Sequence, residues 1–142
     1  MKKPKSGFKK IDNLSCIITM TAGLPKNDKP RIYPEGFERK RAEEIITGNA
    51  EADQFIEAVR IAPSAVNLQP WLIGKNGNRY DFYLRHPKSM MEKMIKDMRR
   101  IDMGIAMAHL YIQAKADGKN VSFNFDGEKI KQGNFIASVI VS

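Results

Sequence analysis

Residues 61–71, I-A-P-S-A-V-N-L-Q-P-W, constrain the fold more than any other stretch of this chain. They include two prolines and the only tryptophan. Because each proline fixes φ and removes a backbone donor, we expect an ordered turn here rather than a helix. Ser64, Asn67 and Gln69 alternate with small or apolar residues, so the turn offers uncharged donors and acceptors to the edge of a flat heterocycle. The plainer alternative is a proline-rich connection from a helix to a strand, with Trp71 in the core.

The residues on either side of this turn predict a helix before it and a β-hairpin after it. Residues 51–62 carry apolar side chains at helical spacing, and Asn49 is the expected N-cap. Residues 71–73 and 80–84 are typical of two strands, joined by a hairpin turn in the K-N-G-N sequence at 75–78. The turn is therefore expected to lie between a helix and a hairpin.

The remainder of the chain predicts two more helices and two closing strands. Ser89 is the expected cap of a helix over residues 90–100, and residues 101–117 predict a helix that is apolar almost all round. Residues 121–125 alternate with period two, and residues 135–141 form an apolar run typical of a buried strand. We therefore expect an α+β domain with helices packed on a mostly antiparallel sheet.

The N-terminal region has a different composition from the rest. Residues 1–13 are polar and rich in lysine, residues 14–22 predict a buried strand, and residues 24–34 contain three prolines. We therefore divide the chain into a basic arm, strand and proline-rich connector at 1–35 and a folded domain at 36–142. The predicted strand has no obvious partner upstream of it.

Composition narrows the classes of function. A formal charge of +8 and a pI near 9.6 suit a phosphorylated ligand, an acidic partner or nucleic acid. The basic residues lack interleaved exposed aromatics, which argues against a sequence-specific nucleic-acid module and leaves electrostatic binding through the N-terminal lysines as a weaker alternative. One cysteine and two histidines predict neither a disulfide nor a zinc site and fit a reducing cytoplasm. No apolar run is long enough to predict a membrane span.

No pair of residues suggests catalysis by the protein's own side chains, and no glycine-rich phosphate loop is present. His109 is expected to be partnered inside its apolar helix, and Asp102 to cap that helix. Arg39 and Arg41, on either side of Lys40, predict either a phosphate grip or a solvated charged segment. Six methionines at helical spacing are expected to fill the core, namely Met90, Met91, Met94, Met98, Met103 and Met107.

Residues 62–71, A-P-S-A-V-N-L-Q-P-W, resemble the signature of the nitroreductase family, A-P-S-x-x-N-x-Q-P-W. Residues 101–118 resemble the family's long central helix, and residues 135–141 its closing strand. The resemblance extends from about Glu38 to the C-terminus. It implies an α+β flavoprotein, usually an intertwined homodimer with FMN between subunits, that passes hydride from NAD(P)H to nitroaromatics, quinones or similar acceptors. The flavin performs the redox step in such proteins, which accounts for the missing catalytic pair.

The resemblance also implies which residues bind FMN. By motif position, Pro63, Ser64 and Asn67 would contact the isoalloxazine, while Gln69 supports the turn. The family's phosphate-binding segment reads like R-R-S-x-R, and its nearest match here is R-K-R at 39–41, followed by Ala42 instead of serine. The cofactor-binding residues that we predict are Pro63, Ser64, Ala65, Asn67, Gln69, Arg39 and Arg41.

One branch of the family resembles this chain more closely, namely single chains made of two nitroreductase-like halves. Residues 14–22 and the G-L-P-K-N-D-K-P that follows resemble the end of a first half and its connector, so the chain would correspond to the second half. We therefore expect an FMN-dependent NAD(P)H oxidoreductase that forms a homo-oligomer or pairs with a partner half-domain. The alternative is a truncated, non-catalytic subunit that needs a partner chain to complete its flavin site.

Overall fold

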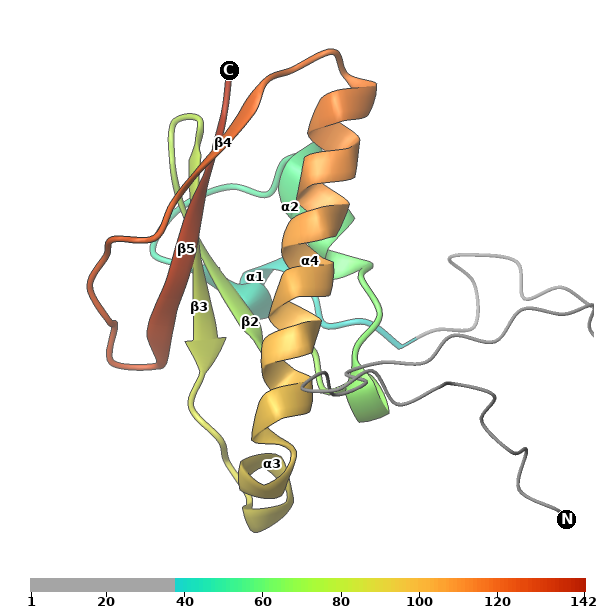
Figure 1. Cartoon of the computed structure of the whole chain (residues 1–142), viewed down its shortest axis with the longest axis vertical. Coiled ribbons are helices and arrows are strands. Elements are labelled where there is room, and N and C mark those ends of the chain that lie inside the picture. The colour runs from blue at the N-terminus through green and yellow to red at the C-terminus, as the bar shows by residue number, and fades with distance from the viewer. Residues whose placement is uncertain (1–37) are drawn as a thin grey trace, which may run out of the picture. The chain divides into compact units, whose positions relative to one another are not determined.

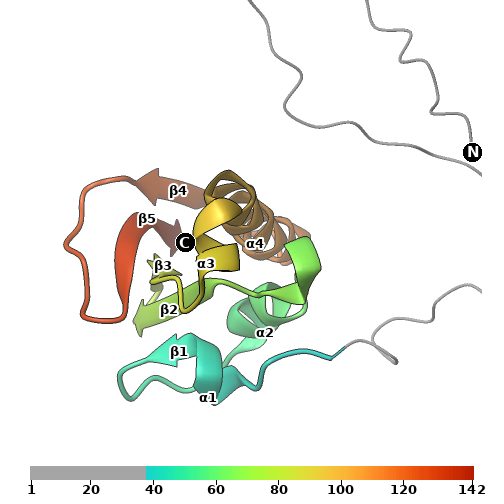
Figure 2. The ribbon, with the colours of Figure 1, turned by 90° about the horizontal axis from the view of Figure 1, so that it is seen from below.

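The computed structural model describes residues 38–142, which form a five-stranded sheet with helices α2 and α4 on one face (Figures 1 and 2). The strand order is β1-β2-β3-β5-β4; β1 pairs with β2 in parallel, and the other three pairs are antiparallel. The α+β prediction is therefore confirmed. The arm, strand and connector predicted at 1–35 lie outside the described residues. The elements are α1 (Ala42–Ile45), β1 (Ile46–Thr47), α2 (Gln54–Arg60), the 3₁₀ turn η1 (Ala65–Asn67), β2 (Trp71–Asn76), β3 (Arg79–Arg85), α3 (Met90–Met94), α4 (Lys96–Ala116), β4 (Val121–Asn124) and β5 (Gly133–Val141).

The core lies between the sheet and the two longer helices. Side chains on β3 alternate, so that Tyr80, Phe82 and Leu84 are buried against the helices while their neighbours lie on the other face. Trp71 at the start of β2 is fully buried in the same core, as predicted. The turn that precedes Trp71 is thus fixed at one end by a large apolar anchor.

The helix predicted over residues 51–62 is present but shorter, and its N-cap is Asp53 rather than Asn49. Asp53 Oδ1 accepts hydrogen bonds from two backbone N–H groups of the first turn at 3.0 and 2.9 Å. Its Oδ2 accepts from the Tyr80 hydroxyl at 2.5 Å and lies 3.0 Å from Lys75 Nζ. Asp53 therefore caps α2 with one oxygen and ties the helix to the β2–β3 hairpin with the other.

The two helices predicted at 90–100 and 101–117 are divided at a different point. Ser89 caps α3 as predicted, since its Oγ accepts a hydrogen bond from the backbone N of Glu92 at 3.2 Å. The break falls at Ile95, and α4 continues without interruption for 21 residues. The prediction that Asp102 caps a helix is therefore wrong, because this residue lies inside α4.

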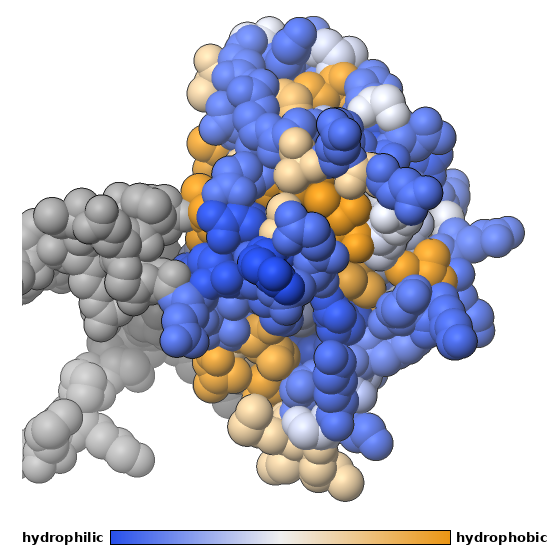
Figure 3. All heavy atoms as spheres, turned by 180° about the vertical axis from the view of Figure 1, so that it is seen from behind, coloured by the Kyte–Doolittle hydropathy of each residue, from blue (hydrophilic) through white to orange (hydrophobic). Residues whose placement is uncertain are grey.

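The prediction that the methionines fill the core is wrong for four of the six. Met90, Met91, Met94 and Met98 are 71%, 56%, 82% and 47% exposed, whereas Met103 is buried. In Figure 1, α3, which holds Met90, Met91 and Met94, lies beyond the ends of the strands. Met98 lies in the first turn of α4. Hydrophilic residues, in blue, cover most of the face in Figure 3. Several moderately hydrophobic residues, in pale orange, lie at the end of the molecule that holds α3.

We expect Asp53→Ala to lower the free energy of unfolding by about 2 kcal/mol. The substitution removes a helix cap and leaves the buried Tyr80 hydroxyl without its acceptor. Urea denaturation of the purified chain measures the change. Glu51→Ala is the matched control, because Glu51 is an exposed carboxylate just before the same helix, and it should change stability by less than about 0.5 kcal/mol. Equal losses in the two variants would contradict this role of Asp53.

Candidate functional site

Residues 63–69, named here the 63–69 turn, have a strained backbone between α2 and β2. Val66, Asn67 and Gln69 have φ values of 46°, 54° and 49°, in the left-handed region that residues other than glycine rarely adopt. Such a conformation persists only where surrounding contacts enforce it, and it occurs often at functional sites. The stretch is an ordered turn, as predicted, and contains the 3₁₀ turn η1.

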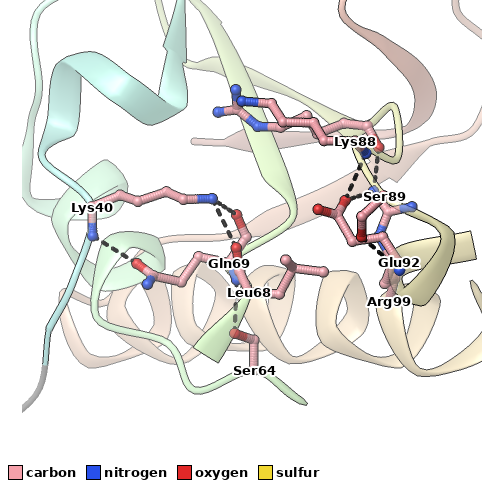
Figure 4. A network of polar contacts seen from close by, with 9 residues as sticks. Lys40, Ser64, Leu68, Gln69, Lys88, Ser89, Glu92 and Arg99 are labelled. Atoms are coloured by element: carbon pink, nitrogen blue, oxygen red, sulfur yellow. Dashed lines mark hydrogen bonds and ion pairs between the residues drawn. The ribbon is translucent and has the colours of Figure 1, made fainter. Parts of the chain in front are cut away.

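Gln69 holds the 63–69 turn together from the inside. It is 4% exposed, and its Oε1 accepts a hydrogen bond from the backbone N of Lys40 at 2.8 Å. Its Nε2 donates to the backbone O of Asn67 at 3.2 Å. The backbone N of Gln69 donates to Ser64 Oγ at 2.8 Å (Figure 4). The Gln69 side chain therefore supports the turn and does not lie on its outer surface.

Lys40 fastens the end of the 63–69 turn from a distant part of the chain. Its Nζ donates to the backbone oxygens of Leu68 at 2.7 Å and Gln69 at 2.8 Å (Figure 4). Burial lowers the pKa of the Lys40 ammonium group, and the positive charges of Arg85 and Lys88 lower it further. Lys40 belongs to the basic run R-K-R at 39–41, and that pattern did not predict this contact.

The structure separates the two arginines that were predicted to bind the cofactor. Arg39 Nη1 donates to Asn67 Oδ1 at 2.9 Å, and its Nε donates to the backbone O of Ile61 at 3.3 Å. The Arg41 side chain is 81% exposed and lies 3.7 Å from Glu44 in α1. Arg39 is thus part of the site's framework, whereas Arg41 is open to solvent.

Asp102, in α4, supports the 63–69 turn by a hydrogen bond to its backbone, a role that was not predicted. It is 3% exposed, and its Oδ1 accepts a hydrogen bond from the backbone N of Ala65 at 2.9 Å. Its Oδ2 is buried without a hydrogen-bond partner among the described residues. Burial raises the pKa of the Asp102 carboxyl, although the Ala65 N–H and the Arg99 charge oppose this shift. A carboxylate within the apolar run at 101–108 was the sequence signal for such a role.

The outer surface of the 63–69 turn is apolar with one carboxamide. Pro63 and Asn67 are exposed, Val66 is 70% exposed, and Ser64 and Ala65 are half-buried. Asn67 Nδ2 donates to the backbone O of Glu38 at 2.8 Å, which fixes the plane of the amide. The surface can therefore pack against a flat ring and hydrogen-bond to its edge. Its one hydroxyl, Ser64 Oγ, already accepts a hydrogen bond from the backbone N of Gln69.

Metal binding and membrane insertion find no support in the part of the chain that the structure describes. No group of three or more His, Cys, Asp or Glu side chains within residues 38–142 could hold a metal ion. Within the same residues, none of the helices has the length and apolar character needed to cross a bilayer.

The chain matches one family model in sequence and one solved structure in fold. The model of the family described as "Putative TM nitroreductase" matches residues 1–114. The crystal structure of a protein titled a putative nitroreductase, from Thermotoga maritima, matches with a TM-score of 0.50 and 22% sequence identity. The match covers 79% of this chain but 46% of the Thermotoga chain, so this chain spans less than half of that protein. No curated protein matches the sequence.

We expect Asp102→Asn and Asp102→Ala to differ in stability. The asparagine variant would keep an acceptor for the Ala65 N–H, whereas Asp102→Ala removes it and should cost about 1–3 kcal/mol of unfolding free energy. Because folding raises the Asp102 pKa above its ordinary 3.8, the wild type should lose stability relative to Asp102→Asn as pH rises from that value through the folded-state pKa. Urea denaturation at about pH 4 and about pH 7 measures both effects.

Two results would contradict this account of Asp102. One is an equal loss of stability in the asparagine and alanine variants. The other is a stability difference between wild type and Asp102→Asn that is the same at both pH values.

Proposed function

The chain belongs to the TM nitroreductase family, and from this premise we propose that it is an FMN-dependent oxidoreductase. The proposed substrates are NAD(P)H as the reductant and nitroaromatic or quinone-like compounds as electron acceptors. The observation that carries the proposal is the hydrogen-bonded 63–69 turn, whose outer surface combines apolar contact with one oriented carboxamide. An isoalloxazine ring needs both features, because it is flat and has hydrogen-bonding groups along one edge.

Each residue at this surface has a proposed task. Pro63, Ser64 and Ala65 would pack against the ring. Asn67 is exposed, and although its Oδ1 and one Nδ2–H are engaged within the protein, its second Nδ2–H would donate to the polar edge of the ring. Gln69 acts through the turn, since its amide is already engaged inside it. A bound flavin would supply the hydride chemistry, which no side chain here can perform.

The two predicted arginines would then act differently. Arg39 places a positive charge 2.9 Å from Asn67 Oδ1, so negative charge on a ring bound at Asn67 would be stabilised. Arg41 has an exposed guanidinium, and guanidinium groups match the oxygens of a phosphate. We therefore assign Arg39 to the ring and Arg41 to the phosphate.

We expect the purified 142-residue chain, mixed with FMN and separated from free FMN on a column, to elute with a flavin absorbance band. Asn67→Gly should weaken FMN binding by about 1 kcal/mol, the net contribution of one hydrogen bond. Glycine is the appropriate replacement because it tolerates the positive φ at this position, whereas alanine would add backbone strain. Asn49→Gly, at an exposed loop position, is the control and should bind FMN as the wild type does. A chain that acquires no flavin band would refute the proposal.

A second candidate function is a non-catalytic subunit that binds flavin only with a partner chain. Exposed hydrophobic residues on α4 and around β4 favour it, because Ile112 and Phe125 are 64% and 72% exposed. Tyr111 and Phe125 each stack on Phe123 with ring centroids 6.4 Å apart, which makes the patch continuous. We propose that this patch is buried by a second copy of the chain in a homo-oligomer or by a partner half-domain.

Light scattering with and without FMN distinguishes the two candidates. The partner hypothesis predicts that the chain retains FMN only in an oligomer. A monomer that retains FMN would exclude this requirement and favour the self-sufficient oxidoreductase. Phe125→Ser should reduce oligomer formation if this patch is the contact, while Met94→Ser, at an exposed apolar position on α3, is the matched control.

A further inference from the structure

The methionines of α3 form an exposed apolar surface at one end of the described domain. Met90, Met91 and Met94 are each more than half exposed. In Figure 1, α3 lies beyond the ends of the strands, and moderately hydrophobic residues project from the same end of the molecule in Figure 3. Single exposed apolar side chains are ordinary on protein surfaces, but three in one five-residue helix make a patch that indicates a contact. Residues 90–96 are named here the α3 tip.

Helical geometry turns the three methionines outward and the one acidic residue of α3 inward. Successive side chains of a helix are rotated by about 100°, so the methionines share an arc of roughly 100° and Glu92 lies on the opposite side. The Glu92 side chain is 13% exposed, and its Oε2 lies 3.9 Å from Nη2 of the buried Arg99. The carboxylate is thus engaged within the protein, and the outward side of α3 is apolar.

Cationic side chains border the methionines. Lys93 and Lys96 are exposed, and neither forms an ion pair within residues 38–142. Arg100 is also exposed and lies 4.0 Å from Asp97, which is the second acid of residues 89–100 beside the engaged Glu92. The exposed cations around the α3 tip therefore outnumber the exposed carboxylates, in a chain whose formal charge is +8. Such a surface attracts a partner that carries negative charge.

The size and shape of the α3 tip favour a lipid surface over a folded protein as the partner. A stable protein interface usually takes roughly 20–30 residues from each side, far more than residues 90–96 supply. A projecting end needs a concave site on a protein, whereas a bilayer admits a few apolar side chains without one. Methionine suits such a contact, because its unbranched and flexible side chain adapts to irregular surroundings.

We propose that the α3 tip docks on the surface of a membrane that contains anionic lipids. The three methionines enter the boundary between headgroups and acyl chains, where burial of apolar side chains is favourable. Lys93 and Lys96 extend along that boundary and pair with the anionic headgroups. Such a peripheral contact needs no helix that crosses the bilayer. It goes beyond the flavin function proposed above and does not depend on it.

Cosedimentation of the purified 142-residue chain with vesicles tests the proposal. At low ionic strength, we expect binding to phosphatidylcholine vesicles that contain about one-third phosphatidylserine, and much weaker binding to pure phosphatidylcholine. The triple variant Met90→Ser, Met91→Ser, Met94→Ser should bind roughly tenfold more weakly, because the tip loses its apolar side chains. The matched control replaces the same three methionines with leucine, which keeps the apolar surface, and should bind as the wild type does.

The lysines of the tip have a control that matches their charge. The double variant Lys93→Gln, Lys96→Gln should bind anionic vesicles roughly tenfold more weakly, because two cations at the headgroups are lost. Lys115→Gln, Lys119→Gln removes the same charge from exposed positions at the other end of α4 and just beyond it, and should lose little affinity.

Three results would overturn the proposal. One is the absence of binding to anionic vesicles. Another is equal weakening by the two lysine pairs, or weakening by the lysine substitutions but not by the serine variant, because either result indicates a general attraction between charges. The third is a serine variant with a smaller oligomer mass in light scattering and unchanged vesicle binding, which would assign the tip to a contact between copies of the chain. None of these measurements involves flavin, so their failure is distinct from that of the proposed function.

Discussion

The left-handed backbone of the 63–69 turn is the constraint on which the rest of the site depends. Residues in such conformations cost of order 1–3 kcal/mol each, so three of them need support from outside the turn. Lys40, in the segment before α1, donates hydrogen bonds to two backbone oxygens of the turn. Asp102 on α4 accepts one from a backbone N–H of the turn, and the Gln69 side chain donates one to the turn's own backbone. The turn is therefore held from several distant parts of the sequence, and its outer surface is free to meet a ligand.

The position of these supports is set by the hydrophobic core. Asp102 is followed on α4 by Met103 and Ala106, which are buried against the sheet, so the carboxylate is placed by helix packing. Trp71 fixes the other end of the turn in the same core. A core packed as densely as an organic crystal has little freedom to shift, so we expect the residues that anchor the turn in this core to hold it in place.

Local patterns were enough to predict the hairpin, the closing strands and the presence of an ordered turn at 63–69. They were not enough to predict β1, because its two residues become a strand only through parallel pairing with β2. The exposed methionines of α3 were misassigned because helical spacing does not reveal whether a sheet lies opposite.

The support of the turn could be predicted only in part. Gln69 was expected to support it from its place in the motif, whereas the contacts of Lys40 and Asp102 join residues far apart in sequence. The difference between Arg39 and Arg41 likewise depends on where each side chain lies in three dimensions. Composition could suggest a phosphorylated ligand but could not indicate where it would bind.

Amide hydrogen exchange in the flavin-free chain tests the central claim most directly. If the 63–69 turn is rigid before any ligand binds, the Ala65 and Gln69 amides should be protected like those of β2, because Asp102 and Ser64 accept their hydrogen bonds. Asp102→Ala should abolish protection at Ala65 while β2 stays protected. Exchange at Ala65 and Gln69 as fast as in an unstructured peptide would contradict a preformed site.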